Sequence, residues 1–460
     1  MKFIYIIIVI VVFASCKDFE DDINKNPNEP STATASQLIA NSSIALQDVS
    51  HNLSGQFLAQ YLSEVEYQDA SFYPQESTSF YGWYQGPLMN LQEVLDNGYG
   101  SNNQQAMAKV LKAYFFWHIT DRWGDVPYNE ALNGIDNLTP IYDTQEAIYN
   151  SLFALLKEAE AQFDESSTLG DDIIYEGNVE SWKKLANSIR LVMALRLSEV
   201  NPTLGKQEFV AAMNDGVMDS NGDSFIFQHL EDANNQSYWF SQIDPTLGNG
   251  REWWALSETL VEHMAPADDP RLLVYGRPNE DNDIVGLEFG TEGVINASEV
   301  SLLGTELWAQ DAPVYLLTYS EILFDLAEAA KLGWISGSDS EAESYYNLAI
   351  EQSFLQWVGN TDELSDFMLE AEISYDAAIA VEQIATQRYV HLFMNGYEAW
   401  AEWRRTGYPD NMVAPKGNEV PTRQIYTENE QFNNSENYEA AIQRQFSGNE
   451  TMYGHVWWDE

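Results

Sequence analysis

Residues 107–131, MAKVLKAYFFWHITDRWGDVPYNEA, combine the buried face of a helix with a turn that follows it. In the first part, the side chains that would share one helix face recur at steps of three and one residues. They are Met107, Val110, Leu111, Tyr114, Phe115 and His118. Gly124 and Pro127 then suit a turn that closes the helix. The stretch predicts that amphipathic helices build this chain.

Helical spacing recurs along most of the sequence. Asp143 and Glu146 indicate a helix that starts at about residue 144. A further helix is expected to begin near Pro313 and to end near Gly333. The sequence therefore predicts a mainly α fold. The other windows with helical spacing are 35–50, 55–68, 82–97, 148–163, 185–195, 252–264, 342–356 and 374–403.

Four long stretches lack a helical pattern and are rich in Gly, Asn, Pro and aromatic residues. Only short strands are expected there, for example over Phe225, Ile226 and Phe227. Long loops inside a compact domain are usually functional, so these stretches form the candidate binding surface. They cover residues 66–81, 216–250, 266–312 and 405–460.

Composition excludes several classes of protein. The 460 residues include 72 Asp and Glu against 22 Lys and Arg, which gives a formal net charge of −50. Nucleic acid would be repelled by such a chain. Because 45% of the residues are hydrophobic, the charge does not signal disorder. The single cysteine excludes disulfides within the chain and any metal site built from several cysteines.

The first residues have the layout of an export signal. Lys2 precedes an apolar run over residues 3–13, and Ala14 and Ser15 lead into Cys16. We interpret residues 1–15 as a lipoprotein signal peptide, Cys16 as the lipidated N-terminus, 16–34 as a tether and 35–460 as one domain. The alternative is an ordinary signal peptide followed by a buried cysteine. The lysine and acidic cluster after Cys16 resembles the tag of Bacteroidetes lipoproteins that reach the outer face of the outer membrane.

No motif for catalysis stands out. The six histidines are scattered, and no nucleophile elbow, phosphate loop or dinucleotide fingerprint is present. With 72 acidic residues, chance carboxylate pairs are certain, so they do not indicate a glycosidase. Two stretches faintly suggest calcium, although solvated acidic loops explain them better. These stretches are residues 219–223 and the set Asp281, Asp283, Gly286 and Glu292.

Several blocks together resemble the SusD/RagB family of outer-membrane nutrient-binding lipoproteins, in particular its starch-binding-like SusD branch. They occur in the order of the family, and the ordered set with the lipobox is specific. The blocks are Ala113-Tyr114 through the Gly124-Asp125-Val126-Pro127-Tyr128 turn, Asp269-Pro270-Arg271-Leu272, residues 312–329, Asn395-Gly396-Tyr397 through Pro409, and Pro421, Arg423 and Tyr426 with the ending 456–459.

The resemblance implies a fold, a function and a partner. The fold would pack tetratricopeptide-like helix pairs against a loop-rich variable half that carries the ligand. The function would be non-catalytic binding of oligosaccharides at the cell surface. The partner would be a TonB-dependent, SusC-like transporter in the outer membrane, to which the lipid-anchored protein delivers its ligand.

Exposed aromatic residues are the candidate ligand contacts, because sugar rings stack their C–H faces on aromatic side chains. The candidates are Tyr73, Trp83, Trp239 and Trp308, which lie in or beside the loop-rich stretches. Trp83 equally suits the first core position of the next helix. Trp253 and Trp254 follow a helical pattern, so at least one is expected in the core.

Three other functions remain open from the sequence. A RagB-like relative would bind peptides, through a groove of backbone-pairing edges rather than exposed aromatic pairs. A helical glycosidase would need two carboxylates that face each other in a cleft. A scaffold of helix pairs would bind another protein and no small ligand.

Overall fold

The computed structural model describes residues 33–74 and 78–459. The predicted signal peptide, the lipidation site Cys16 and all but the last two residues of the predicted tether lie outside the described residues. Within the described residues most regular structure is α-helical, so the predicted fold class is confirmed.

The first half of the chain forms helices of 3 to 22 residues, the longest of which lie between residues 102 and 215. They are α2 (Ala35–Ile44), α3 (Gln47–Ser50), α4 (Leu53–Leu58), α5 (Tyr81–Trp83), α6 (Met89–Asp96), α7 (Asn102–Trp123), α8 (Gln145–Gln162), α9 (Val179–Arg196) and α10 (Pro202–Asp215).

The second half alternates short helices in loop-rich segments with a second group of long helices. They are α11 (Tyr238–Ile243), α12 (Glu258–Met264), α13 (Leu272–Tyr275), α14 (Tyr319–Lys331), α15 (Ser338–Trp357), α16 (Leu364–Phe367), α17 (Ala380–His391), α18 (Gly396–Thr406), α19 (Glu428–Asn433) and α20 (Ser435–Phe446).

Local capping explains where the longest helices begin and end. Ser101 and Gln104 form a reciprocal capping box at the start of α7. The helix ends at Gly124, whose φ of 82° requires a residue without a Cβ. Helix α8 begins after Thr144, whose side chain accepts from the Ala147 amide at 3.3 Å. Both the helix over 107–118 and the start near residue 144 are confirmed.

Two pairs of strands lie among the helices. Strand β1 (Leu62–Glu64) pairs antiparallel with β3 (Trp254–Leu256). Strand β2 (Phe225–Gln228) pairs antiparallel with β4 (Pro313–Leu317), with an irregular register between Phe225 and Ile226. The predicted short strand over residues 225–227 is confirmed.

Strand pairing also explains three wrong helix predictions. The window 55–68 stays helical only to Leu58, because β1 follows it. The window 252–264 is helical only from Glu258, because its first residues form β3. Pro313 opens β4, and the following helix starts after Thr318, whose side chain caps it. In each case a partner strand far away in the sequence decides the local structure.

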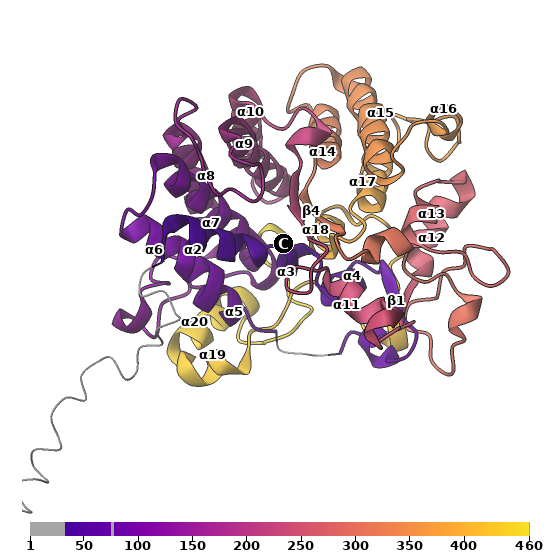
Figure 1. The fold of residues 1–460 in the computed structure, drawn as a ribbon, viewed down its shortest axis with the longest axis horizontal. Coiled ribbons are helices and arrows are strands. Elements are labelled where there is room, and N and C mark those ends of the chain that lie inside the picture. Colours follow the sequence, from indigo (N-terminus) through magenta and orange to yellow (C-terminus); the bar gives the residue numbers. More distant parts are fainter. Residues whose placement is uncertain (1–32, 75–77, 460) are drawn as a thin grey trace, which may run out of the picture.

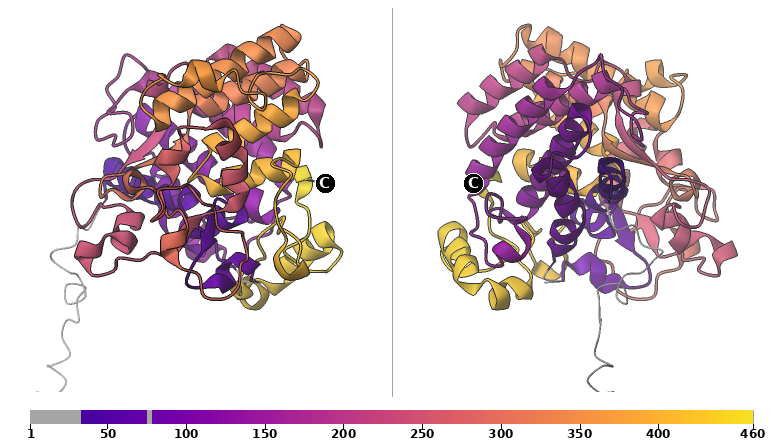
Figure 2. Two further views of the ribbon diagram at one scale, coloured as in Figure 1. Left: turned by 90° about the vertical axis from the view of Figure 1, so that its right-hand side faces the viewer. Right: turned by 60° about the vertical axis from the view of Figure 1, so that its left-hand side comes forward.

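Antiparallel helix pairs form one half of the molecule. Figure 1 shows α6 to α10 at the left and α14, α15 and α17 at the upper right, and α11 to α13 with β1 occupy the lower right. The closest pairs are α14 with α15, α9 with α10 and α7 with α8. The window 374–403 contains two helices, α17 and α18, separated by residues 392–395. Figure 2 shows the same helical layer from two other sides.

Each half has its own hydrophobic core. The larger core lies between the long helices, from α2 through α9 and on to α14, α15 and α17. The second core lies under the loop-rich half and contains α12, β3, and parts of α17 and α18. Helix α18 approaches α4 so closely that a Cβ on Gly396 would lie 2.3 Å from the Gly55 carbonyl carbon. Both helices contribute to the second core, so this contact packs the loop-rich half.

Candidate ligand-binding surface

Two of the four predicted ligand residues are buried. Trp239 is only 2% exposed, and its ring packs edge-on against Trp254 with centroids 5.3 Å apart. Tyr73 is also buried, and its ring lies against Phe289 with centroids 5.2 Å apart. The prediction that Tyr73 and Trp239 lie exposed in loops is therefore wrong. Both residues belong to the core of the loop-rich half, because this region has few long helices and fills its interior with aromatic rings.

The other two predicted residues are half-buried. Trp83 ends α5 and packs against Trp123, while the Arg122 guanidinium lies 4.7 Å from the Trp83 ring centroid. It covers the edge of the larger core, as the alternative interpretation expected. Trp308 lies in the short helix η8 (Thr305–Trp308), which packs against α11. A ligand role for Trp83 or Trp308 stays a prediction.

Three other aromatic residues form a partly exposed surface, here called the aromatic rim: Tyr67, Tyr238 and Trp253. Tyr67 is 61% exposed and Tyr238 is 44% exposed. The rings of Tyr67 and Trp253 meet edge to face, with centroids 4.9 Å apart. The contact fixes the two rings relative to each other while part of each ring remains exposed. The rim therefore has the geometry of a stacking platform.

The strand pair β1 and β3 brings the rim together. Glu64 lies opposite Trp254 in the ladder, and the Val65 amide donates to the Trp253 carbonyl at 2.7 Å. Tyr67 follows β1 by three residues, and Trp253 directly precedes β3. Tyr238 opens α11, whose next residue packs on Trp254. Three distant parts of the sequence thus meet at one edge of the small sheet.

Polar groups adjoin the rim. The Arg251 guanidinium lies 4.3 Å from the Trp253 ring centroid and donates to the Gln242 side chain. Burial raises the pKa of Glu64 to about 7, although hydrogen bonds from the Tyr67 and Glu66 amides oppose the shift. Burial also raises the pKa of Tyr238, while nearby Arg251 lowers it. A cation, an amide and a carboxyl group therefore surround the platform, a combination that suits hydroxyl-rich ligands.

The sequence contained partial signals for this rim. Tyr67 and Tyr238 lie in aromatic-rich stretches that were recognised as candidate binding loops. Trp253 was assigned to a helical pattern, and only the pairing of β3 with β1 reveals that it lies at the surface. Neighbouring Trp254 is buried, so the expectation that at least one of this pair is core is confirmed.

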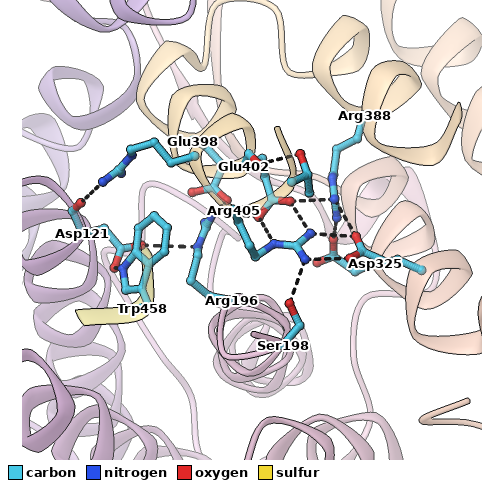
Figure 3. Close-up of polar contacts among 12 residues, drawn as sticks. Asp121, Arg196, Ser198, Asp325, Arg388, Glu398, Glu402, Arg405 and Trp458 are labelled. Atoms are coloured by element: carbon cyan, nitrogen blue, oxygen red, sulfur yellow. Dashed lines mark hydrogen bonds and ion pairs between the residues drawn. The ribbon is translucent and has the colours of Figure 1, made fainter. Parts of the chain in front are cut away.

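A buried cluster of charges lies at the meeting point of the helices and is here called the ion-pair junction. Arg388 contacts Asp325, Glu328 and Glu402 at 2.5–2.7 Å. Arg405 contacts Glu328 at 2.6 Å and Glu402 at 2.7 Å. Figure 3 shows these side chains converging from α14, α17 and α18.

Arg196 extends the junction toward α7. It pairs with Glu398 and, at 2.6 Å, with Glu402, and its Nε lies 3.5 Å from Asp121. Asp121 in turn accepts from the Trp458 indole at 2.8 Å, as Figure 3 shows. All three arginines of the junction have buried side chains.

The pKa values of the carboxyl groups in the junction are shifted, some upward and others downward. Burial raises the pKa values of Asp325 and Glu398 to about 7, against the attraction of Arg388 and Arg196 respectively. Burial alone would also raise the pKa of Glu402, but Arg388, Arg405 and Arg196 together hold it well below its usual range. These carboxyl groups are paired with arginines in the protein interior. They support the architecture of the helix pairs rather than a reaction with a ligand.

Lysine side chains pair with two residues of the first stretch considered for calcium and with one residue of the second. Lys184 lies 3.0 Å from Asp219 and 3.1 Å from Asp223. Glu292 pairs with Lys416 at 2.6 Å. Over residues 33–74 and 78–459, no group of three His, Cys, Asp or Glu side chains is arranged to hold a metal ion.

The fold and the rim define a class of protein before any relative is considered. Helix pairs fixed by buried ion pairs form a rigid scaffold, and the loop-rich half presents partly exposed aromatic rings beside polar groups. This arrangement is typical of a binding protein with a shallow ligand platform.

Comparison with known proteins places the chain in a family. The family model described as SusD-like, starch-binding and associating with the outer membrane matches residues 27–427. The chain therefore belongs to the SusD-like family. The description of this family indicates carbohydrate binding and association with the outer membrane. A comparison with curated proteins gives no match.

Solved structures agree with this assignment. A chitin-binding protein is 29% identical, with a TM-score of 0.77 over 92% of this chain and 98% of its own. A SusD homologue from Bacteroides fragilis is 26% identical, with a TM-score of 0.80 over 93% of this chain and 100% of its own. A chitin-binding SusD homologue from Flavobacterium johnsoniae has 21% identity and a TM-score of 0.78, over 93% and 98% of the two chains, and supports the fold.

Between residues 33 and 459, apart from residues 75–77, no helix combines the length and the apolar character that crossing a bilayer requires.

Proposed function

We propose that this protein is a lipid-anchored protein of the cell surface that captures oligosaccharides at the aromatic rim and delivers them to a SusC-like, TonB-dependent transporter. In this proposal it binds its ligand without converting it. Membership of the SusD-like family supports the carbohydrate ligand and the outer-membrane location.

The observation that carries the proposal is the exposure of Tyr67 and Tyr238 beside Trp253. An aromatic ring that is left partly in water forgoes the stabilisation that its burial would give. Arg251 beside the rings can donate hydrogen bonds to hydroxyl groups of a stacked sugar, whereas Glu64 is buried. Trp308 lies in a turn that packs on α11, so it remains a proposed contact at the edge of this surface.

A first ligand to test follows from the relatives. The 29% identical structure is named as a chitin-binding protein, so chitohexaose is the first probe. A glycan array with the purified protein extends the search to other oligosaccharides. If the protein binds peptides but no glycan, its ligand is a peptide and not a carbohydrate.

Calorimetric titration of Trp253→Ala tests the site. Binding by the unchanged protein is expected at micromolar to millimolar Kd, about −4 to −8 kcal/mol, because a shallow platform must release its ligand to the transporter. The variant should bind at least about tenfold more weakly, because it loses the stacked ring. Its melting temperature should change little.

A matched control is Trp457→Ala, which removes another half-buried indole from the larger core, where the ring packs near Tyr149. This variant should keep the affinity of the unchanged protein. If Trp253→Ala binds with the same affinity as the unchanged protein, the rim is not part of the ligand site.

The anchor and the partner rest on the sequence and the family. Cys16 follows two small residues and an apolar run, and stable membrane residence needs more than one acyl chain. Cys16→Ala should therefore release the protein from membranes washed in high salt. Full retention of that variant in the membrane fraction would contradict the lipid anchor.

A further inference from the structure

A second concave site lies away from the aromatic rim. It is a groove with a cavity volume of about 490 Å³, lined among others by Tyr81, Tyr84, Leu132, Asn133, Asn137 and Asn433. We call it the Tyr81 groove. Its volume lies within the range of about 300–1,000 Å³ that is usual for small-ligand sites. None of the rim residues lines it.

Three segments build the groove from distant parts of the sequence. Figure 1 shows α5 beside α19 and α20 at the bottom of the molecule, whereas β1 and α11 of the rim lie to the right. The third segment is the loop after α7. Asp125 in this loop accepts from the Gln145 amide at 2.8 Å and from Arg444 Nε at 2.7 Å, which fixes the loop against α8 and α20.

The aromatic walls of the groove are held in place. The hydroxyl groups of Tyr81 and Tyr142 both donate to the carboxylate of Glu430, one to each oxygen. The Tyr84 hydroxyl donates to the Pro127 carbonyl at 2.6 Å. Because these contacts fix the rings before a ligand arrives, less conformational entropy is lost on binding.

The lining favours a neutral ligand. Among the described residues that line the groove, Glu430 is the one Asp, Glu, Lys, Arg or His side chain, and it is buried beneath the two phenols. The other polar lining groups are amides and phenols, and Gln85 and Asn433 are exposed. Amides both donate and accept, so they match hydroxyl and acetamido groups. Leu138, which is 74% exposed at the groove, offers an apolar contact for a sugar face.

The backbone of the groove is less suited to a peptide. An extended peptide needs unpaired backbone groups along an edge. Here the carbonyls of Thr139 and Pro140 accept from Asn437 and Asn434 at 3.0 and 2.8 Å. The Ile141 amide donates to Glu130 at 3.2 Å. These backbone groups are already paired, as are the side-chain amides of Asn133, Asn137 and Asn434. The amides of Gln85 and Asn433 are exposed at the groove.

We propose that the Tyr81 groove is a second binding site, which takes a short neutral oligosaccharide between its tyrosine walls and its amide side chains. The inference rests on the proposed carbohydrate-binding function and adds a site that is separate from the rim. A glycan held at two places on one protein would dissociate more slowly than one held at the rim alone.

The experiment combines titration with paired variants of the full-length protein. The probe is chitohexaose or, if an array shows a stronger neutral glycan, that glycan. A double variant, Gln85→Ala with Asn433→Ala, removes two exposed amides from the groove. Tyr81→Leu removes one aromatic wall, and its melting curve shows whether loss of the Glu430 contact affects folding. Gln431→Ala is the control, because Gln431 is an exposed amide on α19 outside the groove.

The expected result is a two-site titration in which the double variant weakens one site at least tenfold and leaves the other unchanged. Trp253→Ala should show the opposite pattern, and Gln431→Ala should match the unchanged protein. If Trp253→Ala abolishes all binding and the groove variants have no effect, the groove is not a binding site. The proposed function would then still stand. No binding of any glycan by the unchanged protein would overturn both proposals.

Discussion

The ion-pair junction and the aromatic rim use arginine in opposite ways. In the junction, Arg388 and Arg405 are buried, and each contacts at least two carboxylates. At the rim, Arg251 is half-buried and stacks on Trp253, and it has no ion pair with a carboxylate of the described residues. Arginines that are paired with carboxylates hold helices together. An arginine without a carboxylate partner keeps N–H groups that can donate to a ligand.

Tryptophan also occurs both buried and at the surface, here within the loop-rich half. Trp239 and Trp254 are buried under the loop-rich half, while Trp253 lies at its edge. Residues of one type therefore serve the core and the surface within a few ångströms of one another. Burial, rather than residue type or position in a loop, separates structural from functional candidates.

The largest expected effect comes from breaking the junction. Arg388→Met removes the cation that contacts Asp325, Glu328 and Glu402 and leaves their charges buried without it. The free energy of unfolding should fall by about 3–5 kcal/mol. Urea denaturation measures the change. Lys183→Ala, which breaks a partly exposed pair with Glu165, should change stability by less than about 1 kcal/mol. Similar losses in the two variants would show that the junction is not the stabilising centre.

Next in size is the loss of a buried tryptophan. Trp239→Ala should lower the free energy of unfolding by about 3–5 kcal/mol, because it leaves a cavity beside Trp254. Trp253→Ala should cost much less stability, because its ring is already half in water. Thermal unfolding of the two variants side by side tests the contrast. A stable Trp239→Ala would mean that its ring is not part of the core.

A smaller effect concerns pH. In the unfolded chain, Asp325 and Glu398 release their protons near pH 4, whereas in the folded protein burial raises their pKa values to about 7. Between these values the folded state binds more protons than the unfolded state, so the free energy of unfolding should decrease as pH rises from 4 to 7. Above pH 7 this contribution is constant.

The variant Asp325→Asn isolates one of these groups. It should reduce the slope of stability against pH between 5 and 7, as measured by denaturation at several pH values. The exposed Asp362→Asn should keep the original slope, because its side chain contacts water in both states. An identical slope in Asp325→Asn and in the unchanged protein would contradict the assignment.

Much of the fold was predictable from local pattern. The face of α7, the start of α8 and the strand over Phe225 to Phe227 follow from spacing and capping residues that lie within a few positions of each other. The errors share one cause. β1, β3 and β4 depend on partners elsewhere in the chain, so propensity in a short window could not reveal them.

The candidate site was predictable only by region. Composition indicates the aromatic stretches around Tyr67 and Tyr238, but it does not distinguish these two residues from Tyr73 and Trp239 in the same stretches. The sequence around a tryptophan or tyrosine in a loop does not indicate whether its ring is exposed to water. Tyr81 and Asn433 lie in stretches expected to form the binding surface, but no sequence signal indicates that they meet in one groove, because its walls are far apart in the sequence.

The sequence by itself determined the helical class, the family blocks, the acidic charge and the start of α8, because each depends on spacing or composition within the chain. The tertiary structure decided which aromatic rings are exposed, which arginines are paired with carboxylates and where the groove forms. Burial and charge pairing are set by neighbours that folding brings together, such as Glu402 with Arg196 and Trp253 with Tyr67.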